Sequence, residues 1–245
     1  NSIGMKLVPI SPGSFTMGQD GPASDYKIAK HPEKFDDADW DEKPTHRVTI
    51  TQTFHMAATE VTLAQYRAMD ADFRAGDKEG DVAVGGISWE QAVKFCEWLS
   101  KKEGKSYRLP TEAEWEKAGR GGLSGKRFPW GDTISHSQAN YFRDPSYNYD
   151  KNTTGTYHPS YRGSGLFPFT APVETFTANN YGLHNMVGNV REWCWDRYGP
   201  YDLGNQSNPH GFDSGTIRVC RGGSWDTSAY YCRVAFRSNN YLGDS

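Results

Sequence analysis

The side chains that could carry redox or metal chemistry are few and widely spaced in this chain. Its four cysteines are Cys96, Cys194, Cys220 and Cys232, and no two of them form a C-x-x-C pair. Zinc-finger and thioredoxin-type sites are therefore not predicted. The even number leaves disulfide bonds open, and buried free thiols are the alternative. The seven histidines are scattered without metal-ligand spacing, so they predict no metal cluster.

A second group of candidate residues is aromatic and basic, and it lies in the carboxy-terminal half. Tyrosine and tryptophan often anchor peptide or sugar ligands, although they also serve as core in an irregular fold. We expect most of these aromatic side chains to be core. Arg233 and Arg237 could bind a carboxylate or sulfate, but we expect them to pair with acidic side chains. The aromatic residues of this group are Trp193, Trp195, Tyr198, Tyr201, Trp225, Tyr230 and Tyr231.

Two main helices are predicted to position these residues. The first runs from Ser88 to Glu103, because Ser88 and Gln91 form a capping-box pattern and Gly104 is a typical stop. Its apolar residues follow helical spacing, at 92, 95, 96 and 99. The second starts at Thr111, with positions 115 and 118 facing inward. A shorter helix is expected to begin near Thr62.

The remaining elements are predicted to be short strands and loops. Residues 7–10 and 14–18 suggest a hairpin across Ser11-Pro12-Gly13, and residues 19–45 suggest a surface loop. Strand-like pieces also occur at 47–50, 54–56, 217–220 and 234–236. No helical period follows Gly119 and no linker divides the chain. We therefore predict an α+β fold with little regular secondary structure, in one domain spanning residues 1–245.

Composition excludes several classes of function. Of the 245 residues, 27 are basic and 30 acidic, and this net charge of −3 argues against nucleic-acid binding. No apolar run approaches the roughly 20 residues of a membrane span, so we predict no transmembrane segment. The chain begins Asn-Ser-Ile rather than with methionine, as a mature form without its export signal would. We expect a periplasmic or secreted location.

The order of short motifs resembles the formylglycine-generating enzyme, or sulfatase-modifying-factor, family. The resemblance runs through nearly the whole chain. The matching segments are 12–18 (PGSFTMG), 42–48 (EKPTHRV), 60–62 (EVT), 88–92 (SWEQA), 108–116 (RLPTEAEWE), 128–132 (FPWGD), 170–173 (TAPV), 181–183 (YGL), 185–193 (NMVGNVREW) and 221–225 (RGGSW). This resemblance implies a compact, irregular α+β fold related to C-type lectins. The same fold hosts unrelated functions, so function depends on the site.

The resemblance implies two calcium sites, for which oxygen ligands are required. At the first, Asn185 and Glu192 would supply side-chain oxygens, while Gly188 and Val190 would supply backbone carbonyls. The alternative is a simple turn, with Glu192 paired to an arginine. The second site would use Asn140 and the carbonyls of Tyr141 and Phe167. There the expected acidic ligand is replaced by Gly165, which weakens the site or leaves it empty.

The resemblance also places the oxidase site of the family's enzymes. These enzymes bind Cu(I) with two cysteine thiolates shortly after a Gly-Gly-Ser sequence, which ends here at Ser224. The second position is Cys232, but the first is Thr227, whose hard hydroxyl cannot replace a thiolate. Cys220 or Cys194 could supply a substitute if either approached Cys232. Copper is therefore not expected. Cys232 and Ser224 are the candidate catalytic residues of the resemblance, and we favour a structural role for Cys232.

Three functions follow from the resemblance. We favour a non-catalytic domain that binds a ligand or joins a complex, with a protein or carbohydrate as its partner. The alternatives are a divergent oxidoreductase, as in the pyoverdine-maturation branch, and a formylglycine-generating enzyme proper. Members of the family usually continue into a final strand after the segment matched by residues 237–240. This chain stops at Ser245 without it, so either the sequence is cut or its ending differs.

Overall fold

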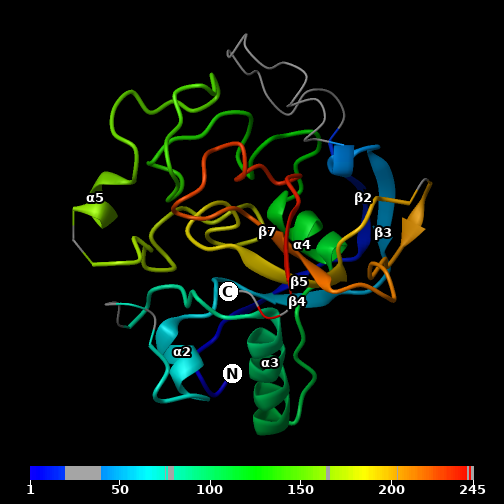
Figure 1. Ribbon diagram of the computed structural model, residues 1–245. Helices are drawn as coiled ribbons and strands as arrows, with labels where there is room; N and C mark the ends of the chain where they lie inside the picture. The colour runs from blue at the N-terminus through cyan, green and yellow to red at the C-terminus, as the bar shows by residue number, and fades with distance from the viewer. Residues whose placement is uncertain are drawn as a thin grey trace.

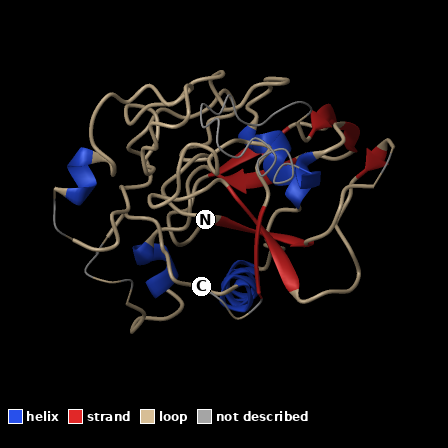
Figure 2. Cartoon of the chain, turned by 45° about the horizontal axis from the view of Figure 1, so that its top comes forward, coloured by secondary structure: helices blue, strands red, loops and turns tan. Residues whose placement is uncertain are grey.

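The computed structural model describes residues 1–19, 40–74, 76, 80–163, 166–202, 204–241 and 243 (Figure 1). Strands and helices are short, and Figure 2 shows that loops and turns form most of the trace. The predicted α+β fold with little regular secondary structure is therefore confirmed. No helix in the described part of the chain is long and apolar enough to cross a membrane.

In the described residues, eight strands form three small sheets. β1 (Leu7–Ile10) pairs with β4 (Phe54–Ala57), and these two strands run antiparallel to each other. The second sheet has the order β2-β3-β6 and the third has the order β5-β7-β8. These strands are β2 (Gly13–Met17), β3 (His46–Ile50), β6 (Gln206–Ser207), β5 (Glu192–Arg197), β7 (Ile217–Arg221) and β8 (Ser238–Tyr241).

Two strand predictions were wrong. Residues 7–10 and 14–18 do not form a hairpin, because β1 pairs with β4 while β2 pairs with β3. The turn after β1 instead carries the chain from one sheet to the next. Residues 234–236 lie in turns rather than in a strand, and the strand forms at β8. The local apolar pattern at 234–236 reflects burial of Val234 and Ala235 in a turn.

The predicted helices are confirmed, because their signals are local. α2 (Leu63–Arg67), α3 (Trp89–Glu103) and α4 (Glu112–Gly119) each begin with a complete capping box, at Thr62, Ser88 and Thr111. Gly104 ends α3 in the left-handed conformation, with φ +63°. Two short helices among the described residues were not predicted, a 3-10 helix η1 (Trp40–Glu42) and α5 (Pro159–Arg162).

The helix α4 lies at the centre of the molecule, where it packs against β2, β5 and β7 (Figure 1). Trp115 and Ala118 are fully buried, as predicted. The charged side chains Glu112 and Glu116 are buried as well, which an amphipathic pattern does not anticipate. The 3-10 helix η1 lies within residues 19–45, which were predicted to be a surface loop. Its side chains Asp41 and Glu42 are nevertheless buried. Residues 20–39 of that segment lie outside the described residues.

Candidate functional site

A cavity of about 1100 Å³ lies between β1, β4, α3 and the loops that flank β5 and follow β7. Its apolar lining residues include Leu7, Phe54 and Met56, which are half-buried, and the buried side chains Met5, Phe95 and Leu99. Its polar lining residues, which we call the polar wall, comprise Glu60, Asn189, Arg191, Glu192, Ser224 and Asp226. The polar wall therefore brings together residues from both of the sequence motifs expected to carry function, 185–193 and 221–225.

The loop before β5 owes its shape to left-handed backbone conformations. Asn185, Gly188 and Asn189 have φ values of +53°, +75° and +64°. A Cβ on Gly188 would lie 2.3 Å from the carbonyl oxygen of Asn140, so only glycine allows the loop this close approach. Residues 185–190 therefore curl tightly at the polar wall.

Glu60 is hydrogen-bonded to this loop; it lies in the matching segment 60–62 but was not predicted as a site residue. Its carboxylate accepts hydrogen bonds from Nδ2 of Asn185 (2.9 Å) and Nδ2 of Asn189 (3.0 Å). Burial raises the pKa of Glu60 to about 8, and the neighbouring charge of Glu192 contributes. Burial also raises the pKa of Glu192 to about 7, although a hydrogen bond from the indole of Trp115 (2.9 Å) opposes the shift. Two carboxylates that destabilise each other's charge thus share one wall.

These residues fit a divalent cation. Oδ1 of Asn185 is buried without a hydrogen-bond partner, and it belongs to the predicted first calcium set. A hard cation would use this oxygen and would relieve the repulsion between Glu60 and Glu192. Among the described residues no three histidine, cysteine, aspartate or glutamate side chains form a metal cluster. Such a cation would therefore need amide and backbone oxygens, including the carbonyls of Gly188 and Val190.

The second predicted calcium set makes other contacts. Asn140 donates its amide to the carbonyl of Phe169 (2.8 Å), and its own carbonyl accepts from the Asn189 backbone (2.7 Å). The carbonyl of Tyr141 is bonded to the His136 ring (3.0 Å). Phe167 is 57% exposed at the rim of the cavity. Hydrogen bonds within the protein therefore already engage Asn140 and the Tyr141 carbonyl, two of the three predicted ligands of the second calcium site. Gly165 lies outside the described residues, and the second site stays a prediction.

The thiol site lies behind Gly223. A Cβ on Gly223 would be 2.7 Å from Sγ of Cys232 and 3.1 Å from Oγ1 of Thr227, so these two side chains flank the same glycine. Cys232 is fully buried in an aromatic core cluster that includes Tyr141, Tyr149 and Tyr230. Burial raises the pKa of its thiol to about 12, and a hydrogen bond with Thr227 only partly offsets the shift.

No disulfide bond joins Cys232 to another cysteine. All four cysteines are free thiols. Cys194 packs in a different core cluster, with Ile10 and Trp115, and Cys220 lies on the cavity wall. The Ser224 hydroxyl donates to Asp226 (2.5 Å), and its backbone N–H donates to Thr227 (2.8 Å). Thr227 therefore serves as a hydrogen-bonding residue of the Gly-Gly-Ser loop.

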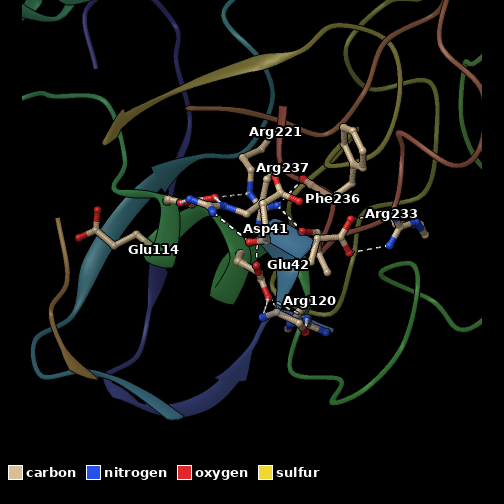
Figure 3. Close-up of polar contacts among 12 residues, drawn as sticks. Asp41, Glu42, Glu114, Arg120, Arg221, Arg233, Phe236 and Arg237 are labelled. Carbon is tan, nitrogen blue, oxygen red and sulfur yellow. Dashed lines mark hydrogen bonds and ion pairs between the residues drawn. The ribbon is translucent and has the colours of Figure 1, made fainter. Parts of the chain in front are cut away.

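Buried ion pairs hold the segment that carries this loop (Figure 3). Arg233 donates two 2.7 Å hydrogen bonds to Glu42, and Arg237 donates at 2.7 and 2.8 Å to Glu112. The prediction that Arg233 and Arg237 pair with acidic residues is confirmed. Because both arginines are nearly inaccessible, neither is free to bind an anionic ligand.

A second part of the same network centres on Glu116 of α4. Its Oε1 accepts hydrogen bonds from the Gly18 backbone (2.8 Å) and from Arg120 (2.7 and 3.0 Å). Its Oε2 accepts a hydrogen bond from Arg221, which also donates to the carbonyls of Ala235 and Phe236. Arg221 immediately precedes Gly222, so the network fixes both ends of the loop that contains Thr227 and Cys232.

The predicted aromatic group divides between core and surface. Tyr230 is 4% exposed, whereas Trp195 and Tyr231 are 40% and 43% exposed. At the rim of the cavity, Trp225 packs edge-on against Phe167 and Phe169, with ring centroids 5.6 and 5.2 Å apart. Sequence analysis singled out Phe167 only for its backbone carbonyl and did not single out Phe169. The rim therefore offers aromatic surface beside the polar wall.

Comparison with known proteins agrees with this structure. Residues 4–245 match the Sulfatase-modifying factor enzyme 1-like domain, and the chain belongs to this family. The formylglycine-generating enzyme of Mus musculus is 40% identical over 158 residues, which cover 63% of this chain and 39% of that protein. The inactive C-alpha-formylglycine-generating enzyme 2 of Mus musculus is 35% identical over 166 residues, covering 65% and 44%. The chain thus spans less than half the length of these curated relatives.

A solved structure supports the same fold. PvdO from Pseudomonas aeruginosa matches with a TM-score of 0.68 and 26% identity, covering 97% of this chain and 89% of that one. The predicted family and fold class are therefore confirmed.

Proposed function

We propose that this chain is a non-catalytic ligand-binding domain on a calcium-stabilised scaffold of the formylglycine-generating-enzyme type. The observation that carries this proposal is the pair of side chains that flank Gly223. A thiolate pair is needed for Cu(I), and here one partner of Cys232 is the hydroxyl of Thr227. The Cys232 thiol is fully buried with its pKa raised to about 12, so it is neither a ready ligand nor a nucleophile near neutral pH.

The proposed calcium ion would be held by Asn185, Glu192 and the carbonyls of Gly188 and Val190. We add Glu60 to the proposed calcium site, as a carboxylate that lies beside the ion's ligand Asn185. Its amide partners Asn185 and Asn189 hold it at the loop. The ion would supply positive charge where two buried carboxylates oppose each other, and it would thereby stiffen the polar wall of the cavity. Calcium modules of modest affinity are typical of extracellular proteins, which suits a periplasmic or secreted location.

The proposed ligand site is the cavity itself. Its volume of about 1100 Å³ is at the upper end of ordinary ligand pockets. Its rim carries Trp225 and the exposed Phe167, and such aromatic surfaces suit a protein segment or a carbohydrate.

The non-catalytic role is tested by restoring the thiol pair. Wild type should bind no Cu(I) at Cys232 and should consume no O₂ with a cysteine-containing peptide. Thr227→Cys should gain Cu(I) binding, and the added variant Cys232→Ser should abolish the gain. Copper-dependent O₂ uptake by wild type would overturn the proposal.

The calcium claim is tested separately, by thermal unfolding with calcium and with a chelator. At a calcium concentration of 100 times Kd, stabilisation is about 2.7 kcal/mol, or roughly 5–11 °C in a domain of this size. Glu192→Gln should lose most of this gain, whereas Glu97→Gln, on the exposed face of α3, should keep it. No calcium-dependent shift in wild type would remove calcium from the proposal.

The second candidate is a divergent oxidoreductase of this family. It is favoured by the 40% identity to a formylglycine-generating enzyme and by the retained Ser224 and Cys232. O₂ uptake by wild type that Cys232→Ser abolishes would support this candidate, whereas uptake that survives the variant would exclude Cys232 as its catalytic group.

A further inference from the structure

Arg191 differs from the other arginines around the site. Arg120, Arg221, Arg233 and Arg237 are buried and paired with carboxylates. Arg191 is exposed, directly precedes β5 and lines the large cavity. Within the part of the chain that the structure describes, no hydrogen bond or ion pair reaches its guanidinium. It is therefore a cation without a counterion in a cavity wall.

The positive charge of Arg191 affects the pKa of two buried thiols, Cys220 and Cys232. Burial raises the pKa of both Cys220 and Cys232 to about 12, and the positive charge of Arg191 lowers each pKa in part. Cys220 lies on the cavity wall, and Cys232 lies behind Gly223. Arg191 is exposed, and it lines the same cavity as Ser224 of the Gly-Gly-Ser loop.

The neighbouring carboxylates of the polar wall already have other partners. Glu60 accepts from two asparagine amides, and Glu192 accepts from the indole of Trp115. Asp226 accepts from the Ser224 hydroxyl. None of these bonds involves Arg191, so its planar fork of donors is available to a ligand.

The apolar part of the lining defines the rest of the ligand. Leu7 of β1 and Met56 of β4 are half-buried and present apolar surface, whereas Phe95 and Leu99 of α3 are buried in the core. Burial of an apolar body there is favourable by roughly 25 cal/mol per Å² of surface removed from water. A guanidinium binds carboxylate, sulfate, sulfonate or phosphate groups through two parallel hydrogen bonds.

We propose that the ligand of this cavity is an amphiphilic oxyanion, whose anionic head binds Arg191 and whose apolar body packs against the half-buried apolar side chains of β1 and β4. This inference rests on the ligand-binding function proposed above and specifies the class of ligand.

The test uses two fluorescent probes with the same apolar body. 8-Anilinonaphthalene-1-sulfonate carries a sulfonate, and N-phenyl-1-naphthylamine does not. Wild type should bind the sulfonate more tightly, and Arg191→Gln should weaken its binding about tenfold, as expected for loss of a charge-assisted pair. Binding of the neutral probe should stay within about twofold. Arg191→Lys should give an intermediate loss, because lysine keeps the charge but not the fork.

Controls locate the binding. Arg47→Gln removes an exposed arginine of β3 that does not line the cavity, and it should leave both affinities unchanged. Trp225→Phe should reduce energy transfer to a bound probe, because Trp225 lines the cavity. Thermal unfolding confirms that each variant is folded.

The outcomes separate this inference from the proposed function. If both probes bind and Arg191→Gln leaves sulfonate binding unchanged, the anionic head is wrong while the ligand-binding cavity stands. If neither probe binds to folded wild type, the amphiphilic ligand is overturned, whereas the non-catalytic role stands or falls with the Cu(I) and O₂ measurements.

Discussion

Removing the charge of Glu116 should destabilise the fold far more than removing that of Glu114 on the same helix. Glu116 is fully inaccessible, and four hydrogen bonds from backbone and arginine donors converge on its two oxygens. Glutamine has one oxygen, so in Glu116→Gln an amide NH₂ must face the donors of Arg120 or Arg221. Either arrangement leaves a buried guanidinium without its counterion.

The expected loss follows from burial. Breaking a buried ion pair by neutralising one partner costs about 3–5 kcal/mol, which corresponds to roughly 6–20 °C for a domain of this size. Glu114 is paired with Arg108, whose side chain is 52% exposed, and it also completes the capping box of α4. Because glutamine can complete a capping box, Glu114→Gln should cost less than about 1 kcal/mol.

Urea and thermal unfolding of the two variants and wild type at pH 7 provide the assay. Equal losses for Glu116→Gln and Glu114→Gln would refute the reasoning, because burial would then have no effect. Burial alone would raise the pKa of Glu116, but the charges of Arg120 and Arg221 hold it below its ordinary value of 4.5. A depressed folded pKa gives stability that is present above pH 4.5 and lost as the pH falls through the folded value. The gap between wild type and Glu116→Gln should therefore close in acid.

Three further predictions concern the site and its surroundings. Gly188→Ala should destabilise the protein more than Gly125→Ala: both glycines have positive φ, but only the first would place a Cβ against backbone, 2.3 Å from the Asn140 oxygen. Similar melting temperatures for the two variants would contradict this. Asp196 has a pKa raised to about 7 by burial and by Glu112, so wild type should lose stability as the pH rises from 4 to 7, and urea unfolding of Asp196→Asn should show a smaller loss. Peptide mapping after iodoacetamide treatment should find Cys232 unmodified in the folded protein at pH 8; rapid labelling would show that its thiol is accessible.

Local signals in the sequence were sufficient for the helices. The capping boxes at Ser88 and Thr111 involve residues only three positions apart, so the backbone conformation they favour needs no tertiary partner. Strand pairing was not predictable in this way. The segments before and after residues 11–12 looked like a hairpin, but each pairs with a more distant strand, because the apolar faces of β1 and β2 are buried in different clusters.

The candidate site shows the same division. The order of the motifs predicted the site positions Asn185, Glu192 and Thr227. Because residue 227 is a threonine, one of the two cysteine thiolates that would bind copper is missing. Tertiary structure was needed to place Glu60, 125 residues from Asn185, beside it. In the sequence Glu60 is an ordinary glutamate, and its pKa is raised only by the burial and the neighbours that folding provides.

The sequence by itself determined the family, the helices and the chemical nature of each site residue, because these depend on residue identity and on short spacings. Only the tertiary structure decided which charges are satisfied. It buries Arg233 and Arg237 against carboxylates, and it leaves Arg191 without a partner among the described residues at a cavity wall. The physical reason is that the energy of a charge depends on its solvation and its nearest counterions, which chain folding sets and residue order does not reveal.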